Sequence, residues 1–199
     1  MRLYCEDNQE EGLGRQVIFL RLSIPKPDAQ RSTTAIAGRT GKSAWHEADR
    51  IFQMVKPVIV IACGGMGKRM GGSKPLRRLG ELTLLRHACD WAMARSDYVA
   101  LAVREAGQLF DEGLPLLIDR HTGIGPISAL ASAFDFALAT KREYVLVIGC
   151  DQPFLPNDLV ARLSAAIGDR GAAMPTSLGR EQPLATLWRA DRGALTEYL

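Results

Sequence analysis

Glycines and basic side chains gather in one short segment of this sequence, between Gly64 and Lys74. Five glycines lie between positions 64 and 72, and Lys68, Arg69 and Lys74 place three cations within seven residues. Because glycine has no side chain, such a backbone can turn tightly and point several N–H groups at one anion. The combination predicts a triphosphate site, because donors and cations together match a triphosphate better than the pyrophosphate of a dinucleotide.

Two better-known glycine motifs do not fit the sequence. The dinucleotide fingerprint G-x-G-x-x-G, started at Gly65, would need a glycine where Met70 stands. The segment 41–43 (GKS) resembles the end of a phosphate-binding P-loop, but Ile36 occupies the position of its first glycine. A surface turn with solvated basic residues is the alternative interpretation of 64–74. The apolar run directly before Gly64 favours a phosphate-binding loop.

A lone carboxylate, Asp151, follows the apolar run 144–148. Mg²⁺ in proteins is commonly held by one or two carboxylates together with phosphate oxygens and water. An aspartate after a strand can also be a turn or capping residue. If Asp151 lies at the same sheet edge as the glycine segment, the metal-binding interpretation is favoured.

Weaker signals follow two other apolar runs. Asp119 could contact a base or ribose, or lie in a solvated turn, and Gly125 would let the backbone approach a ligand just before a helix. Arg104 is interpreted as a surface cation. The remaining candidates are interpreted as structural or exposed: His46, His87, His121 and Cys150.

The elements that must position these residues alternate along the chain from position 57. Short apolar runs predict strands at 58–62, 98–103, 116–118 and 144–148, and a weaker one at 183–188. Helical spacing predicts helices near 84–91, 126–138 and 159–163, the second with an apolar face of Ile127, Leu130, Ala131, Phe134 and Leu138. This order predicts an α/β fold with a Rossmann-like, mostly parallel sheet and helices on both faces. Ligands of such sheets bind at the carboxyl ends of the strands, so the glycine segment and Asp151 can share one site.

Composition narrows the class of protein. The 199 residues allow one sizeable domain, and a formal net charge of +3 is too small to indicate a nucleic-acid partner. No apolar run approaches the length of a membrane span, and the four cysteines include no C-x-x-C pair. We therefore expect a cytoplasmic protein with reduced thiols, no membrane contact and no structural zinc. We expect residues 1–56 to form a poorly ordered N-terminal extension of unknown role. We expect the rest of the chain to form one domain at 57–199.

Four segments resemble the signature sequences of the molybdenum cofactor guanylyltransferase family. Residues 62–74 are similar to the pattern L-A-G-G-x-x-x-R-M-G-x-x-K, and 125–129 (GPISA) to G-P-L-A-G. Residues 150–156 (CDQPFLP) are similar to C-D-x-P-[FY]-[IL]-P, and 182–184 (QPL) to a later H-P or Q-P strand. The agreement in order and spacing runs over about 58–199. The glycine motif alone is shared with cytidylyltransferases, but the four together are more specific.

The resemblance implies a nucleotidyltransferase domain that transfers GMP from GTP to the phosphate of molybdopterin-bound molybdenum, releasing pyrophosphate, with Mg²⁺ as cofactor. It implies that Lys74, Arg69 and Asp151 take part in catalysis and that Asp151 binds the metal. The nucleotide-binding residues would be Cys63, Gly64, Gly65, Lys68, Lys74, Asp119 and Gly125. The protein would be a monomer or form transient complexes with molybdenum cofactor proteins.

The sequence departs from the family pattern at several positions. Cys63 replaces an alanine, Ala129 replaces the last glycine of G-P-L-A-G, and an asparagine common near Val103 is missing. The family's late N-x-N-T segment has no counterpart, so the domain is expected to be short at its C-terminal end. Residues 1–53 match nothing in the family, and we expect Met54 to be the natural start.

Two alternatives stay open at this point. A related enzyme could use CTP on molybdopterin or on a small phosphorylated acceptor, although the double glycine Gly64-Gly65 favours the guanine branch. The second alternative is a non-catalytic module that holds nucleotide or pterin for a partner.

Overall fold

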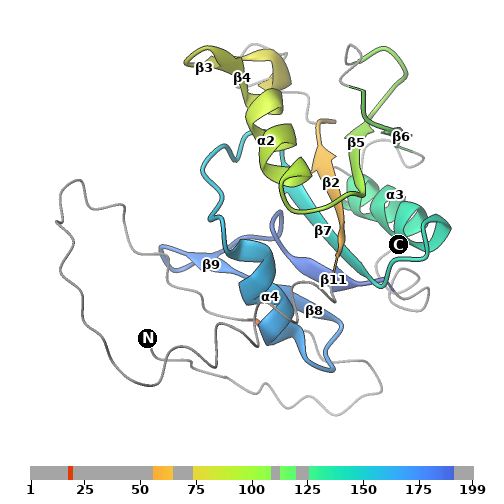
Figure 1. Cartoon of the computed structure of the whole chain (residues 1–199), viewed down its shortest axis with the longest axis vertical. Helices are drawn as coiled ribbons and strands as arrows, with labels where there is room; N and C mark the ends of the chain where they lie inside the picture. Colours follow the sequence, from red (N-terminus) through yellow and green to blue (C-terminus); the bar gives the residue numbers. More distant parts are fainter. Residues whose placement is uncertain (1–17, 20–55, 65–73, 109–112, 120–125, 191–199) are drawn as a thin grey trace, which may run out of the picture.

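The computed structural model of the chain describes residues 18–19, 56–64, 74–108, 113–119 and 126–190. They form a seven-stranded sheet (Figure 1). Its strands are, in spatial order, β1 (Ile18–Phe19), β8 (Ala172–Met174), β11 (Leu187–Arg189), β7 (Tyr144–Gly149), β2 (Val58–Ala62), β5 (Val99–Val103) and β6 (Leu116–Ile118). In the series β7, β2, β5 and β6, each strand is parallel to the next. Strand β11 is antiparallel to both β7 and β8. The predicted mostly parallel α/β sheet is confirmed.

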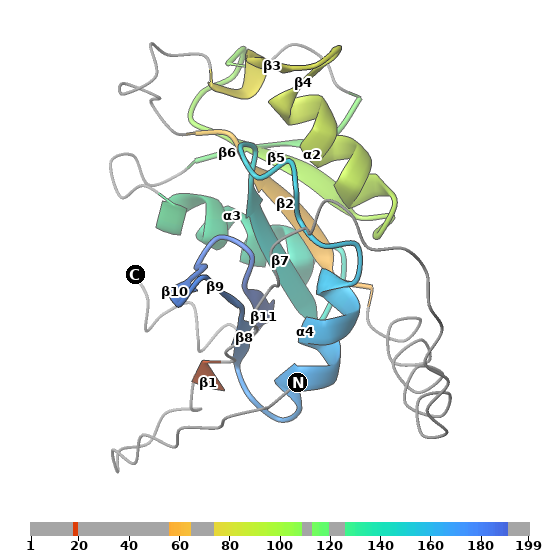
Figure 2. The ribbon, with the colours of Figure 1, turned by 90° about the vertical axis from the view of Figure 1, so that its left-hand side faces the viewer.

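The helices divide between the two faces of the sheet, which Figure 2 shows from the side. Helices α2 (Leu84–Met93) and α4 (Leu159–Ile167) lie on one face, and α3 (Pro126–Ala139) covers the other. Helix α2 begins where it does because the Thr83 hydroxyl accepts a hydrogen bond from the Arg86 N–H at 3.1 Å, a typical N-cap. Helices on both faces confirm the predicted layering.

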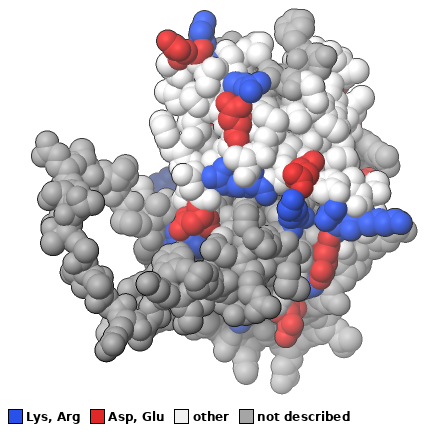
Figure 3. Space-filling view, in the orientation of Figure 1, with Lys and Arg blue, Asp and Glu red and all other residues white. Residues whose placement is uncertain are grey.

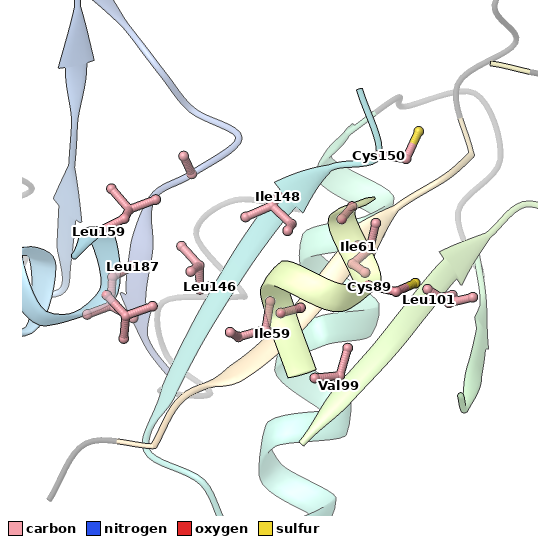
Figure 4. Close-up of a cluster of buried hydrophobic side chains, with 14 of the residues drawn as sticks. Ile59, Ile61, Cys89, Val99, Leu101, Leu146, Ile148, Cys150, Leu159 and Leu187 are labelled. Atoms are coloured by element: carbon pink, nitrogen blue, oxygen red, sulfur yellow. The ribbon is translucent and has the colours of Figure 1, made fainter. Parts of the chain in front are cut away.

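The central strands carry apolar side chains on both faces because a helix layer buries each face. The side chains directed toward α2 and α4 include Ile59, Ile61, Leu146 and Ile148 (Figure 4). Those under α3 include Val58, Val60, Val145 and Val147. The strand β2 is the clearest case, since residues 58–61 are all 0% exposed. Two packed layers hold the ends of β2 and β7, and with them the residues that follow, in fixed relative positions.

The packing face of α3 differs from the predicted one. Ala129, Ala133 and Ala137 lie against the sheet, whereas Ile127 is 45% exposed and Leu130 only partly buried. These alanines recur every four residues, so they form a stripe of their own along the helix. Their small side chains let the helix approach the strands closely. Of the predicted apolar face, Ala131 and Phe134 are buried as expected, whereas Ile127 is exposed, so the predicted face is confirmed only in part.

The chain after α4 is less regular than predicted. The strand expected at 183–188 starts only at Leu187, and β8 and the hairpin of β9 (Thr176–Ser177) and β10 (Arg180–Glu181) were not anticipated. Residues 182–186 form a loop in which the Thr186 hydroxyl donates to the Gln182 carbonyl at 3.2 Å. A second short hairpin, β3 (Arg78–Leu79) with β4 (Leu82–Thr83), precedes α2. Strands of two or three residues are too short to give a periodic signal.

Two residues of the N-terminal extension belong to the sheet, since β1 pairs in parallel with β8. In the described part of the chain, every helix is too short or too polar to cross a lipid bilayer. Basic and acidic side chains stand next to one another on the described surface that Figure 3 shows. This distribution agrees with the small net charge of the sequence.

Candidate active site

The carboxyl ends of the four parallel strands meet at one edge of the sheet. Gly64 follows β2, Arg104 follows β5, Asp119 follows β6 and Asp151 follows β7, with one residue between strand and functional residue in β2 and β7. Hydrogen bonds continue the ladder just beyond the strands: the Asp119 N–H donates to the Val103 carbonyl at 2.8 Å. The predicted residues therefore emerge side by side from a rigid support.

Lys74 and Asp151 make direct contact at this edge. The Lys74 Nζ lies 2.5 Å from the Asp151 Oδ2, and the two side chains are 28% and 39% exposed. Lys74 is held by the short 3₁₀ turn Lys74–Leu76, whose Pro75 is buried. Lys74, the end of the glycine segment, therefore lies next to Asp151, as expected from the strand order. Partial exposure leaves both charged groups accessible to a ligand.

The orientation of Asp151 depends on Gly149. A Cβ at position 149 would lie 2.7 Å from the Asp151 Oδ1, closer than real Cβ contacts come. The side chain of Gln152 then folds back, and its Oε1 accepts a hydrogen bond from the Gly149 N–H at 2.7 Å. A glycine at the end of β7 therefore makes the space in which this carboxylate sits.

A second polar pocket lies beside Gly64, where Asp119 and Arg104 converge. A Cβ at position 64 would lie 3.2 Å from both the Asp119 Oδ2 and the Arg104 Cγ. The Asp119 Oδ1 and the Ser128 Oγ are buried, and neither makes a hydrogen bond of good geometry with a described residue, although the Ser128 hydroxyl lies close enough to Asp119 to act on its pKa. Buried polar atoms normally have partners, so a carboxylate left this way is suited to a ligand that donates hydrogen bonds.

Burial raises the pKa of the Asp119 carboxyl above its usual value, while the nearby Ser128 hydroxyl and the Arg104 guanidinium act in the opposite direction. Burial dominates because taking a carboxylate out of water disfavours its charged form. Perturbed groups of this kind are frequent in functional sites. Arg104, interpreted from the sequence as a surface cation, is exposed but forms one wall of this pocket.

A glutamine that sequence analysis missed ties two strand ends together. Gln108 donates from its Nε2 to the Cys63 carbonyl at 2.7 Å, and its Oε1 accepts from the Arg104 N–H at 2.8 Å. One side-chain amide thus fixes the spacing between the ends of β2 and β5, which form the walls of the Asp119 pocket. A glutamine in a loop belongs to no local sequence pattern from which this role could be predicted.

Cys63 lies beneath the site rather than in it. Its side chain is 1% exposed, its thiol donates to the Ile61 carbonyl at 3.5 Å, and its N–H donates to the Ala102 carbonyl at 2.9 Å. Cys150 is buried alongside, and the Cys63 thiol lowers the pKa of the Cys150 thiol, with burial acting in the opposite direction. The structural role expected for Cys150 agrees with its burial, and a nucleotide contact by the Cys63 side chain does not agree with its placement.

Four of the predicted ligand-binding residues, Gly65, Lys68, Arg69 and Gly125, lie outside the described residues. Lys74, Asp119, Asp151 and Gly64 lie inside them and line one edge.

The donor set fits Mg²⁺ only in company with a ligand. In the described residues no cluster of three His, Cys, Asp or Glu side chains could hold a metal ion. Asp151 offers one partly exposed carboxylate with a neighbouring cation. Mg²⁺ commonly takes one or two carboxylates and fills its other positions with phosphate oxygens and water. A single carboxylate beside a segment expected to bind phosphate matches that preference.

Comparison with known proteins agrees with this architecture. The family model for the MobA-like NTP transferase domain matches residues 59–199. The chain is 36% identical over 146 residues to the molybdenum cofactor guanylyltransferase of Shewanella loihica, covering 70% of this chain and 73% of the relative. It is 38% identical over 144 residues to that of Acidiphilium cryptum, covering 70% and 71%.

Solved structures of low sequence identity share the fold. Molybdopterin-guanine dinucleotide biosynthesis protein A from Archaeoglobus fulgidus superposes with a TM-score of 0.54 at 19% identity, covering 70% of each chain. A cytidylyltransferase from Leptospira borgpetersenii gives a TM-score of 0.53 at 13% identity, covering 72% of this chain and 63% of its own. The model match and the sequence identities show that this chain belongs to the family of MobA-like NTP transferase domains.

Proposed function

We propose that this protein transfers GMP from GTP to the phosphate of molybdopterin-bound molybdenum and releases pyrophosphate. The observation that carries the proposal is the contact of Lys74 with Asp151 at the carboxyl edge, with the Asp119 pocket beside it. A cation, an accessible carboxylate and a group of polar side chains on one edge are what nucleotidyl transfer from a triphosphate requires. The names of the relatives supply the guanine and molybdopterin specificity.

The chemistry is an in-line displacement at the α-phosphorus of GTP. An oxygen of the acceptor phosphate forms the new bond to phosphorus, the bond to the bridging oxygen breaks, and pyrophosphate leaves. The acceptor phosphate is already ionised at neutral pH, so no residue has to remove a proton. The protein's part is to position the groups and to neutralise charge, and Lys74 would offset the charge on the leaving pyrophosphate.

Asp151 would hold Mg²⁺ together with oxygens of the nucleotide. Bound there, Mg²⁺ would supply charge neutralisation and Lewis acidity at the phosphates. In this structure the Lys74 Nζ forms an ion pair with the Asp151 Oδ2. Asp151 would therefore give up this ion pair, or share its carboxylate between Lys74 and Mg²⁺, when the nucleotide binds. Arg69 and Lys68, which precede Lys74 in the glycine segment, would bind the triphosphate.

Asp119 would select guanine. Guanine presents two adjacent donors on one edge, the N1–H and the N2 amino group, to a carboxylate, whereas cytosine presents an acceptor next to its amino group. The buried Asp119 Oδ1, which makes no hydrogen bond of good geometry with a described residue, would gain one from such a base. Gly64 keeps the pocket open because a side chain there would meet Asp119.

Calorimetry with GTP, CTP, ATP and UTP in the presence of Mg²⁺ tests the nucleotide. We expect GTP to bind at least tenfold more tightly than the others, since a site built for hydrogen bonds rejects bases that leave its groups unpaired. Preferential binding of CTP would assign the protein to the cytidylyltransferases instead. Pyrophosphate release in the presence of GTP and molybdopterin tests the reaction, and binding of GTP without release would indicate a non-catalytic module.

We propose a cytoplasmic location and transient contacts with other molybdenum cofactor proteins. The three described cysteines, Cys63, Cys89 and Cys150, are thiols that no disulfide joins, which supports a reducing compartment. Fractionation of cells that express the full chain checks the location.

A further inference from the structure

Two glutamine side chains tie neighbouring chain segments together at the carboxyl edge, one on each side of the Lys74–Asp151 pair. Gln108 joins the end of β2 to the end of β5, as described above. Gln152 joins the end of β7 to the loop 182–186 that precedes β11. Each amide uses its oxygen for a backbone N–H and its nitrogen for a backbone carbonyl, so each fixes a distance between two segments.

The Gln152 link holds a loop that is itself constrained. The Gln152 Nε2 donates to the Leu184 carbonyl at 2.9 Å, while its Oε1 accepts from Gly149. The next residue, Ala185, has φ +135°, a backbone conformation that residues with a side chain rarely adopt. Strain of this kind persists where the surroundings enforce it, and it is frequent at ligand sites. The loop 182–186 is therefore held against β7 in one shape.

The order of the strands separates the substrates. In the proposed reaction Asp119 and Gly64 would place the nucleoside over β2, β5 and β6, and Lys74 would hold the phosphates near the ends of β2 and β7. In an in-line displacement the attacking and leaving groups lie on opposite sides of the phosphorus. In the proposed reaction the acceptor would then approach from the other side of Asp151, toward β7 and the loop 182–186 that Gln152 holds.

We propose that Gln152 is a positioning residue for the phosphorylated acceptor, and Gln108 the corresponding residue for the nucleotide. This inference rests on the proposed function and assigns one amide to each substrate. Neither side chain needs to touch its substrate, because each acts through the segments that it joins. Loss of one link should therefore alter the binding of one substrate and spare the other.

The experiment compares Gln152→Leu with Gln108→Leu, which removes the same amide on the other side of Asp151. Pyrophosphate release is measured while GTP and molybdopterin are varied in turn. Gln152→Leu is expected to raise the KM for molybdopterin about tenfold and to leave the KM for GTP within about twofold, the size expected for one or two lost hydrogen bonds. Gln108→Leu is expected to give the reverse, with a similarly weakened GTP affinity in calorimetry.

A second variant, Gln152→Glu, separates the effect of losing the hydrogen-bonded link from the effect of a damaged fold. Its carboxylate still accepts from the Gly149 N–H but cannot donate to the Leu184 carbonyl. Both Gln152 variants should raise the acceptor KM and accelerate amide hydrogen exchange in residues 182–186. A rise for Gln152→Glu alone would reveal charge repulsion and overturn the inference. A purely structural role would lower the melting temperature and leave both KM values unchanged, which overturns it as well.

The outcomes also distinguish the inference from the proposed function. Wild-type protein that releases no pyrophosphate with GTP and molybdopterin removes the proposed function and the inference together. Active wild-type protein whose two leucine variants affect both substrates equally removes the inference alone.

Discussion

Single residues at the carboxyl edge divide into those that carry charge and those that make room for it. Asp151 and Lys74 carry opposite charges 2.5 Å apart, both partly exposed. Gly149 and Gly64 matter because they have no side chain. A Cβ at position 149 would meet the carboxylate of Asp151, and a Cβ at position 64 would meet that of Asp119. In the proposed reaction Gly149 shapes the metal-binding carboxylate and Gly64 shapes the contact with the base, so mutation can separate the two roles.

Replacement of Asp151 by asparagine should slow turnover and leave the fold intact. We expect Asp151→Asn to lower turnover by roughly 10² to 10³, about 3–4 kcal/mol, because an amide cannot replace the charge of a carboxylate. Pyrophosphate release at saturating GTP and Mg²⁺ measures the effect. Asp90→Asn is the matched control, since Asp90 forms an exposed pair with Arg86 on α2 and should retain full activity. Near-full activity of Asp151→Asn would remove this residue from the mechanism.

Adding one methyl group to each glycine should separate turnover from binding. Gly149→Ala places a Cβ 2.7 Å from the Asp151 Oδ1, so the carboxylate must move, and we expect turnover to fall at least about tenfold. Gly64→Ala places a Cβ 3.2 Å from the Asp119 Oδ2 and should instead weaken GTP binding. Steady-state kinetics of both variants measures the difference. Identical changes in both would show that the methyl groups act only on stability.

Secondary-structure elements set where these residues can go. Parallel pairing of β2 with both β5 and β7 brings three strand ends to one edge, and the buried run of β2 anchors them. Helix α2 adds a link from the other side, because the Trp91 Nε1 donates to the Leu155 carbonyl at 3.1 Å and steadies the segment after Asp151. Elements far from this edge can be altered without effect on the site.

The tip of the β9–β10 hairpin offers a test of local stability. Leu178 and Gly179 connect the two strands with φ values of +52° and +75°, and Leu178 is 77% exposed. A two-residue turn with positive φ at both positions favours asparagine followed by glycine. Leu178→Asn should therefore stabilise the protein by about 1 kcal/mol, which raises the melting temperature by roughly 2–4 °C.

Thermal unfolding measures this change, with Leu178→Val as the control. Valine is branched at Cβ and tolerates positive φ even less than leucine, so this variant should melt at a lower temperature than the wild type. Activity should be unchanged in both. An asparagine variant no more stable than the wild type would show that the hairpin does not take part in the cooperative unit.

At the scale of the whole molecule, the partly buried Asp119 carboxylate lowers stability at a place where we propose that it binds the nucleotide. Burial raises the pKa of Asp119, so its ionised form is less favourable in the folded protein than in the unfolded chain. A raised carboxyl pKa means that stability is fully present below the unfolded value and is lost as pH rises through the folded value. At neutral pH the charged Asp119 therefore destabilises the fold, and a bound base would compensate.

Asp119→Asn tests this trade because it removes the charge and keeps the shape. We expect the difference in melting temperature, variant minus wild type, to be more positive at pH 7 than at pH 4, while GTP affinity falls. Melts at the two pH values and calorimetry with GTP provide the measurements. A difference that stays constant with pH would mean that the carboxyl pKa is not raised in the folded state.

Much of this architecture was predictable from the sequence. Continuous β-branched runs at 58–62 and 144–148 can be buried only between two helix layers, and they became β2 and β7. Because parallel strands share a carboxyl edge, residues directly after them had to be neighbours. That rule is enough to predict that Lys74 and Asp151 lie close together.

The tertiary structure decided which atoms meet. No local pattern indicates that Gln108 and Gln152 bridge separate segments, that Cys63 points into the core, or that α3 packs through its alanines. Such contacts depend on how far each loop reaches and which side of a helix the sheet leaves open, and both are set by chain segments remote in sequence. Periodicity and composition record the burial of an element, whereas the partner of each polar atom is fixed only when the elements pack.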